Sequence, residues 1–70
     1  MNKEVHEFLA DIELFYNRWS QISFSDNNQW EQAMQEGKEL MQYYEPKIGK
    51  LAESTVNSFI AFLMEESKMR

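Results

Sequence analysis

Apolar residues recur along this 70-residue chain at spacings of three and four, and this periodicity constrains the fold more than any other feature. Each run of such positions marks one face of a helix. The first run is Val5, Phe8, Leu9, Ile12, Phe15, Tyr16, Trp19 and Ile22; the second is Trp30, Ala33, Met34, Gly37, Leu40, Met41 and Tyr44; the third is Ile48, Leu51, Ala52, Thr55, Val56, Phe59, Phe62 and Leu63. No segment shows the strict alternation of a strand. The spacing therefore predicts one all-α domain over 1–70: a small three-helix bundle, up-down-up, with helices near 3–23, 29–44 and 46–67.

Short polar residues predict where the helices begin. Asn2 is a suitable N-cap for the first helix. The segment 23–29 is rich in Ser, Asn and Asp, whose side chains compete for backbone hydrogen bonds, so we expect a loop. Asn28 followed by Glu31 resembles a capping box and places the second start near Gln29.

Pro46 is the single proline, and it lies between the second and third apolar runs. Its ring clashes with the carbonyl of Gln42 and disfavours helical geometry at Glu45, so we expect the second helix to stop there and Pro46 to open the third. The apolar spacing nevertheless stays in phase across Pro46. The alternative is one long kinked helix, which would leave apolar surface for a helical hairpin to dimerise.

The three runs predict a core that contains Phe8, Phe15, Trp19, Leu40, Phe59 and Leu63. Gly37 lies at the centre of the second run, where glycine costs about 1 kcal/mol relative to alanine. We interpret it as a place where another helix approaches closely, through Trp19.

Composition limits the classes of function. The net charge of −5, from 7 Lys and Arg against 12 Asp and Glu, offers no basic face for phosphates, so direct nucleic-acid binding is not expected. No apolar run is long enough to cross a membrane. The absence of cysteine removes disulfides as a stabilising device and favours a cytoplasmic protein. Richness in Asn, Lys, Glu, Ile, Phe and Tyr suggests a bacterial or phage source.

Residues with catalytic or metal-binding chemistry are sparse. His6 is the single histidine, and no ligand stands four residues along on its face, so we predict no metal site. No nucleophile motif is present, so we predict no catalytic residues, no cofactor and no enzyme activity.

Acidic residues decorate the first two helices. Glu4, Glu7 and Asp11 form a row on the first, with Arg18 at its end, and Glu31, Glu36 and Glu39 lie on the second. We interpret them as solvated charge. The alternative is an acidic nucleic-acid mimic that blocks the basic groove of a nucleic-acid-processing enzyme.

The third helix is apolar over more of its circumference than one core needs. We predict a self-association or partner surface formed by Asn57, Ile60, Ala61 and Met64, with a homodimer favoured. The alternative is that this apolar face of the third helix is covered by the chain's own N-terminal loop. Tyr43 lies off the second run and is predicted to contact a partner.

The resulting hypothesis is a non-enzymatic protein-protein interaction module, such as a bacterial or phage regulator, inhibitor or assembly factor that binds a larger protein. A self-assembling structural subunit is a further alternative. The identity of the partner does not follow from the sequence.

Overall fold

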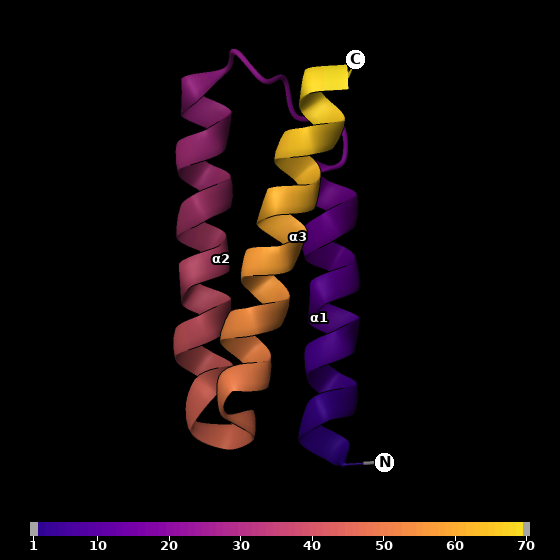
Figure 1. Cartoon of the computed structure of the whole chain (residues 1–70). Coiled ribbons are helices and arrows are strands. Elements are labelled where there is room, and N and C mark those ends of the chain that lie inside the picture. The colour runs from indigo at the N-terminus through magenta and orange to yellow at the C-terminus, as the bar shows by residue number, and fades with distance from the viewer. Residues whose placement is uncertain (1, 70) are drawn as a thin grey trace.

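The helical periodicity corresponds to three helices in the computed structural model, which describes residues 2–69. They are α1 (Lys3–Trp19), α2 (Asn27–Ile48) and α3 (Lys50–Met69). Figure 1 shows α1 and α3 running in one direction and α2 in the other. No strand occurs in the described part, and the predicted all-α three-helix bundle is confirmed.

Short polar side chains fix the starts of the first two helices. The side-chain oxygen of Asn2 accepts a hydrogen bond from the backbone N–H of Glu4 at 2.7 Å, as predicted for an N-cap. α2 begins earlier than predicted because Asp26, rather than Asn28, caps it. The Asp26 carboxylate accepts the backbone N–H of Gln29 at 3.0 Å and faces the positive end of the helix dipole.

α1 ends at Trp19, before the predicted end at 23. The backbone N–H of Ile22 donates to the carbonyl of Trp19 at 3.0 Å in a turn, and the Ile22 side chain is buried. The periodicity therefore predicted the burial of Ile22, but a turn rather than a helix achieves it.

The chain reverses at Gly49 and not at Pro46. α2 continues through Pro46 to Ile48, and the N–H of Gly49 still donates to the carbonyl of Glu45 at 2.8 Å. Gly49 then takes a φ of 68°, which glycine adopts without steric cost, and α3 begins at the next residue. The prediction that Pro46 opens the third helix is wrong, and so is the alternative of one kinked helix.

Pro46 is tolerated because it lies in the last turn of α2. The residue removes one helical hydrogen bond, the one to the carbonyl of Gln42. Both residues are exposed, so water can reach that carbonyl. Reversal requires the positive φ of a residue such as Gly49, which proline, fixed near −65°, cannot adopt.

Buried side chains form two clusters along the bundle axis. The cluster towards Gly49 contains Phe8, Ile12, Tyr44, Ala52 and Val56, and the cluster towards the α1–α2 loop contains Phe15, Trp19, Ile22, Ala33 and Leu63. Of the six predicted core residues, four are buried, whereas Leu40 and Phe59 are partly buried and pack against both clusters.

Gly37 allows α2 and α3 to approach closely. A Cβ atom at this position would lie 3.0 Å from Cδ1 of Ile60 and 3.1 Å from Cγ1 of Val56. Such distances leave no room for a methyl group without movement of a neighbour. The predicted close approach is confirmed, but it involves α3 and not Trp19 of α1.

Candidate protein-interaction surfaces

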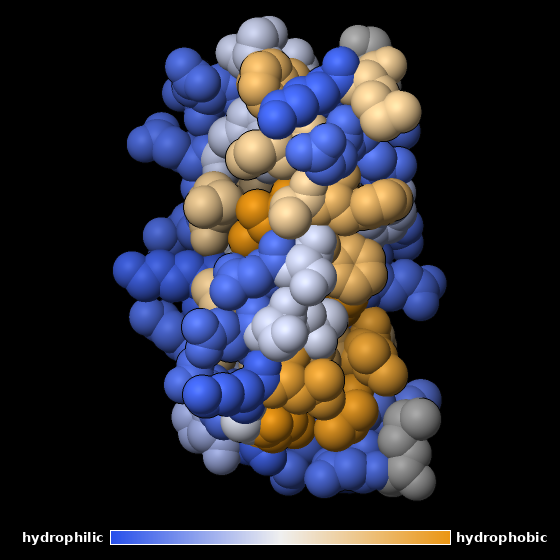
Figure 2. Space-filling model, in the orientation of Figure 1, coloured by the Kyte–Doolittle hydropathy of each residue, from blue (hydrophilic) through white to orange (hydrophobic). Residues whose placement is uncertain are grey.

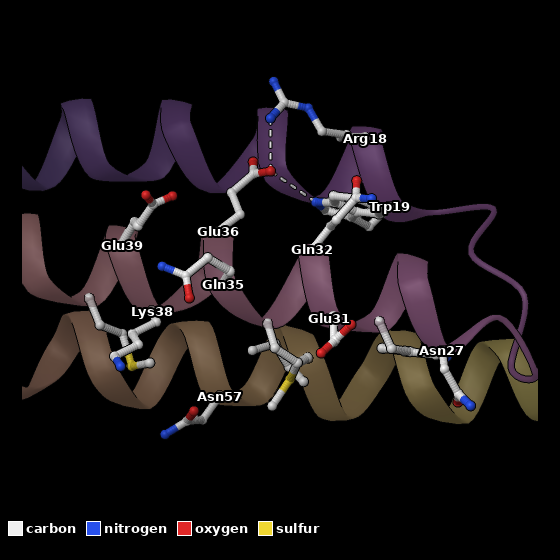
Figure 3. A pocket seen from close by; sticks show the side chains of 14 residues that line it. Arg18, Trp19, Asn27, Glu31, Gln32, Gln35, Glu36, Lys38, Glu39 and Asn57 are labelled. Carbon is white, nitrogen blue, oxygen red and sulfur yellow. Dashed lines mark hydrogen bonds and ion pairs between the residues drawn. The ribbon is translucent and has the colours of Figure 1, made fainter.

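Polar contacts join α1 to α2 on one side of the bundle. One carboxylate oxygen of Glu36 accepts hydrogen bonds from the Arg18 guanidinium at 2.8 Å and from the Trp19 indole N–H at 3.1 Å (Figure 3). The indole belongs to the core, so its polar atom would otherwise lose its partner on burial. Glu36 thus has a structural role in this side of the bundle.

Tyr44 forms a second polar contact between the same helices. Its hydroxyl donates to a carboxylate oxygen of Asp11, and its ring packs edge-on against Phe8 with 5.0 Å between centroids. Burial, and then the hydrogen bond and charge of Asp11, raise the pKa of Tyr44 far above its ordinary value of 10.0. The phenol therefore stays protonated and acts as a hydrogen-bond donor, not as a base.

The outer surface of α2 carries a broad, open depression (Figure 3). Amide and charged side chains dominate its rim, and those of Gln35, Glu39 and Asn57 point in different directions in Figure 3. They do not converge on one position where a substrate atom could react. Over residues 2–69, no group of three or more histidine or acidic side chains could hold a metal ion.

The structure places the four predicted interface residues of α3 on the side nearest α2 and on its outer edge. Asn57 and Ala61 are exposed, and Met64 is 38% exposed. Ile60 is half-buried, because it packs against both core clusters and lies over Gly37. The sequence therefore overestimated the exposure of Ile60, which α2 partly covers. The interface itself stays a prediction.

Methionines of α2 extend this surface. Met34 is 50% exposed and Met41 is half-buried, and both line the same depression as Asn57 and Ile60. We call Met34, Met41, Ile60 and Met64 the α2–α3 face. The sequence did not reveal the contribution of α2, because helical spacing does not show which helices are neighbours.

Tyr43 does not join this face. It lines a smaller depression with Asp11 and Tyr44 on the α1–α2 side of the bundle. The ring is exposed, packs edge-on against Tyr44 with 4.8 Å between centroids, and lies 3.9 Å below the ammonium of Lys47. The sequence correctly placed Tyr43 outside the core. In the structure, however, Tyr43 lies on a different side of the bundle from the predicted interface residues of α3.

A second apolar surface lies where α1 and α3 run side by side. Phe62 is 51% exposed, and Leu9 and Leu51 are nearly half exposed. The ring of Tyr16 lies 6.1 Å from that of Phe62, and its hydroxyl donates to Glu66 at 3.0 Å. We call Val5, Leu9, Tyr16, Leu51, Phe59 and Phe62 the α1–α3 face; Figure 2 shows apolar side chains along both helices in this view.

Leu9, Leu51 and Phe62 belong to the apolar runs of the sequence, but the structure leaves their side chains about half exposed. Each lies at the edge of its apolar run, turned away from the centre of the bundle. The width of the apolar runs could have revealed this exposure, since a helix in a small bundle buries only a narrow stripe.

Comparison with known protein families, with curated proteins and with solved structures found no match for this chain. Among the described helices, none combines the length and apolar character required to cross a membrane.

Proposed function

We propose that this protein is a non-enzymatic interaction module that binds a larger protein through the α2–α3 face. The observation that carries the proposal is the exposure of Met34 and Met64 on either side of the half-buried Ile60. Two helices with apolar side chains between them form the type of surface that receives an amphipathic helix. Methionine is flexible and polarisable, so it adapts to the shape of such a ligand.

The charges around the face favour a mainly apolar contact. Lys38 and Asn57 border the depression beside Met41 and Ile60, and the remaining charged side chains that line it are of both signs: Arg18, Glu31, Glu36 and Glu39. We therefore expect a partner helix with an apolar stripe and a polar or acidic residue near Lys38. A regulator, inhibitor or assembly factor of a bacterium or phage, acting in the cytoplasm, is the class that fits a small acidic chain without cysteine.

The nucleic-acid mimic is less well supported. Such a protein needs acidic side chains that are free to face a basic groove. Here Glu36, Asp11 and Glu66 accept hydrogen bonds from side chains of the same chain, and Arg18 interrupts the acidic surface. These contacts favour a structural role for several of the acids.

The test is affinity capture from the source cell with three proteins: the parent, Met34→Glu combined with Met64→Glu, and a control with Leu14→Glu and Asn17→Glu. Both pairs add two charges at exposed helix positions, but the control pair lies on α1. We expect the parent and the control to retain the same partner at high salt, which screens surface charge, and the methionine variant to lose it. Loss of the partner from both variants, or from neither, would contradict the proposal.

A further inference from the structure

Methionine is concentrated on the α2–α3 face. The chain has five methionines, and Met34, Met41 and Met64 belong to this face. The buried members of the two core clusters include no methionine. Among the described residues, sulfur is therefore gathered on the surface that the partner is proposed to use, and the buried core is free of it.

Met34 and Met64 lie at the same level of the bundle, one on each helix of the face. Met34 precedes Gly37 by three residues, and Met64 follows Ile60 by four. Gly37 and Ile60 face each other, and α2 and α3 run in opposite directions (Figure 1). Each methionine is thus one helical turn from this contact, towards the α1–α2 loop. With 50% and 38% of their surfaces exposed, both can be reached by a small oxidant in water.

We propose that Met34 and Met64 are a reversible oxidation site that controls binding at the α2–α3 face, an inference that rests on the function proposed above. Hydrogen peroxide transfers one oxygen atom to each methionine sulfur: the O–O bond breaks, an S–O bond forms, and water leaves. The sulfur is oxidised by two electrons and the peroxide is reduced by two. The chain has no cysteine thiol to compete for the oxidant. Methionine sulfoxide reductases reverse the product.

Oxidation changes the face and spares the core. The sulfoxide oxygen accepts hydrogen bonds, and water supplies them in the free protein because Met34 and Met64 are exposed. When an apolar partner helix covers the face, this oxygen loses its water and gains no donor. We expect two sulfoxides to raise the dissociation constant roughly 30-fold or more. The core clusters keep their packing, since their buried members contain no sulfur.

Peptide mapping by mass spectrometry and circular dichroism test the oxidation step on the free protein. The intact chain is treated with hydrogen peroxide, which catalase then removes. We expect Met34, Met64 and the highly exposed Met69 to be oxidised before the half-buried Met41, with the melting temperature nearly unchanged. Oxidation of Met41 first, or unfolding once Met34 and Met64 are oxidised, would overturn the proposal.

Capture from a lysate of the source cell tests the effect on binding. The immobilised chain alone is oxidised before the lysate is added, so the partner never meets peroxide. The parent is compared with Met34→Leu combined with Met64→Leu, which keeps apolar side chains of similar volume and cannot form the sulfoxides, and with Met69→Leu as the matched control. We expect oxidation to release the captured protein from the parent and from Met69→Leu but not from the double variant. Sulfoxide reductase should restore capture by the parent.

The outcomes separate the oxidation site from the function on which it rests. If the reduced and oxidised parent capture the same protein equally well, the oxidation site is wrong and the interaction surface is unaffected. If the double leucine variant also loses the protein on oxidation, the responsible oxidation is not at Met34 and Met64, and the proposal is excluded. If the reduced parent captures nothing, the proposed function fails and the control by oxidation fails with it.

Discussion

α1 meets its two neighbours in different ways. Towards α2 it presents Asp11, Arg18 and the indole N–H of Trp19, and each has a defined polar partner on α2. Towards α3 it presents the ring of Tyr16, whose hydroxyl donates to Glu66 of α3, and the half-exposed Leu9. The first side is closed by directional contacts that set the position of the helices, whereas the second leaves apolar side chains in water.

This difference separates structural from functional roles. Buried polar groups with partners fix one arrangement of the helices, because any other would leave them unpaired. Exposed apolar groups stabilise the monomer little and favour binding another surface. The polar α1–α2 side therefore maintains the fold, and the apolar faces on either side of α3 are available for contacts with other molecules.

The largest loss of stability is expected from truncating a side chain of the core, which lies beneath both sides of α1. Phe15 is buried, and Phe15→Ala should destabilise the fold by about 3–5 kcal/mol, enough to unfold a domain of this size. Phe62→Ala removes the same group from a half-exposed position and should cost about 1 kcal/mol or less. Circular dichroism during thermal unfolding measures both. Equal losses of stability would mean that the α1–α3 face is part of the core.

Much of the fold could be predicted because the helical period and the apolar face that it produces are local properties of the sequence. Phe8, Phe15, Trp19 and Leu63 were placed in the core correctly, and all four are buried. The reversal was misplaced because Pro46 gives the stronger sequence signal. The backbone needs a positive φ at that point, and only the three-dimensional path of the chain shows that Gly49 supplies it.

The candidate site was predicted less well, because it depends on which helices are neighbours. The residues of α3 were proposed from their spacing, but Met34 of α2 was counted only as part of the second apolar run, although it is half exposed. Ile60 was assigned to the surface, although Gly37 lets it pack beneath α2. Both errors concern the contact between two helices, about which the pattern of a single helix carries no information.

A smaller loss of stability is expected from adding a side chain at Gly37, where α2 and α3 approach closely. In Gly37→Ala the added methyl group meets Cγ1 of the buried Val56 and Cδ1 of Ile60. The gain in helix propensity, about 1 kcal/mol, is outweighed by overpacking of about 1–3 kcal/mol, so we expect a net loss of about 1 kcal/mol. Adding Ile60→Val should restore part of it, as measured by urea unfolding. A stabilised Gly37→Ala protein would show that α3 can move away from α2.

An effect of similar size is expected from removing one hydroxyl on each side of α1. Tyr44→Phe leaves Asp11 without its donor and should cost about 1–2 kcal/mol. Tyr16→Phe removes the hydrogen bond to Glu66 at a more exposed position and should cost less. Urea unfolding at neutral pH measures both. The reverse order would contradict the view that the α1–α2 side determines the fold.

The same Tyr44→Phe variant tests how the stability of the fold depends on pH. The pKa of Tyr44 is raised in the folded state by burial and by Asp11, whereas in the unfolded chain it is near 10.0. Above that pH the unfolded state has lost a proton that the folded state retains, so stability falls as the pH rises. We expect the parent to lose more stability above about pH 10 than Tyr44→Phe does. An equal alkaline loss of stability in the two proteins would contradict this assignment.

Methyl NMR of methionine tests most directly the claim that the α2–α3 face binds a partner. With ¹³C-labelled methionine methyl groups, Met34 and Met64 report on this face, and Met69, near the end of α3 and highly exposed, is an internal control. On titration with the captured partner, we predict that the Met34 and Met64 signals shift or broaden together while the Met69 signal stays in place. Perturbation of Met69 with unchanged Met34 and Met64 would contradict the account.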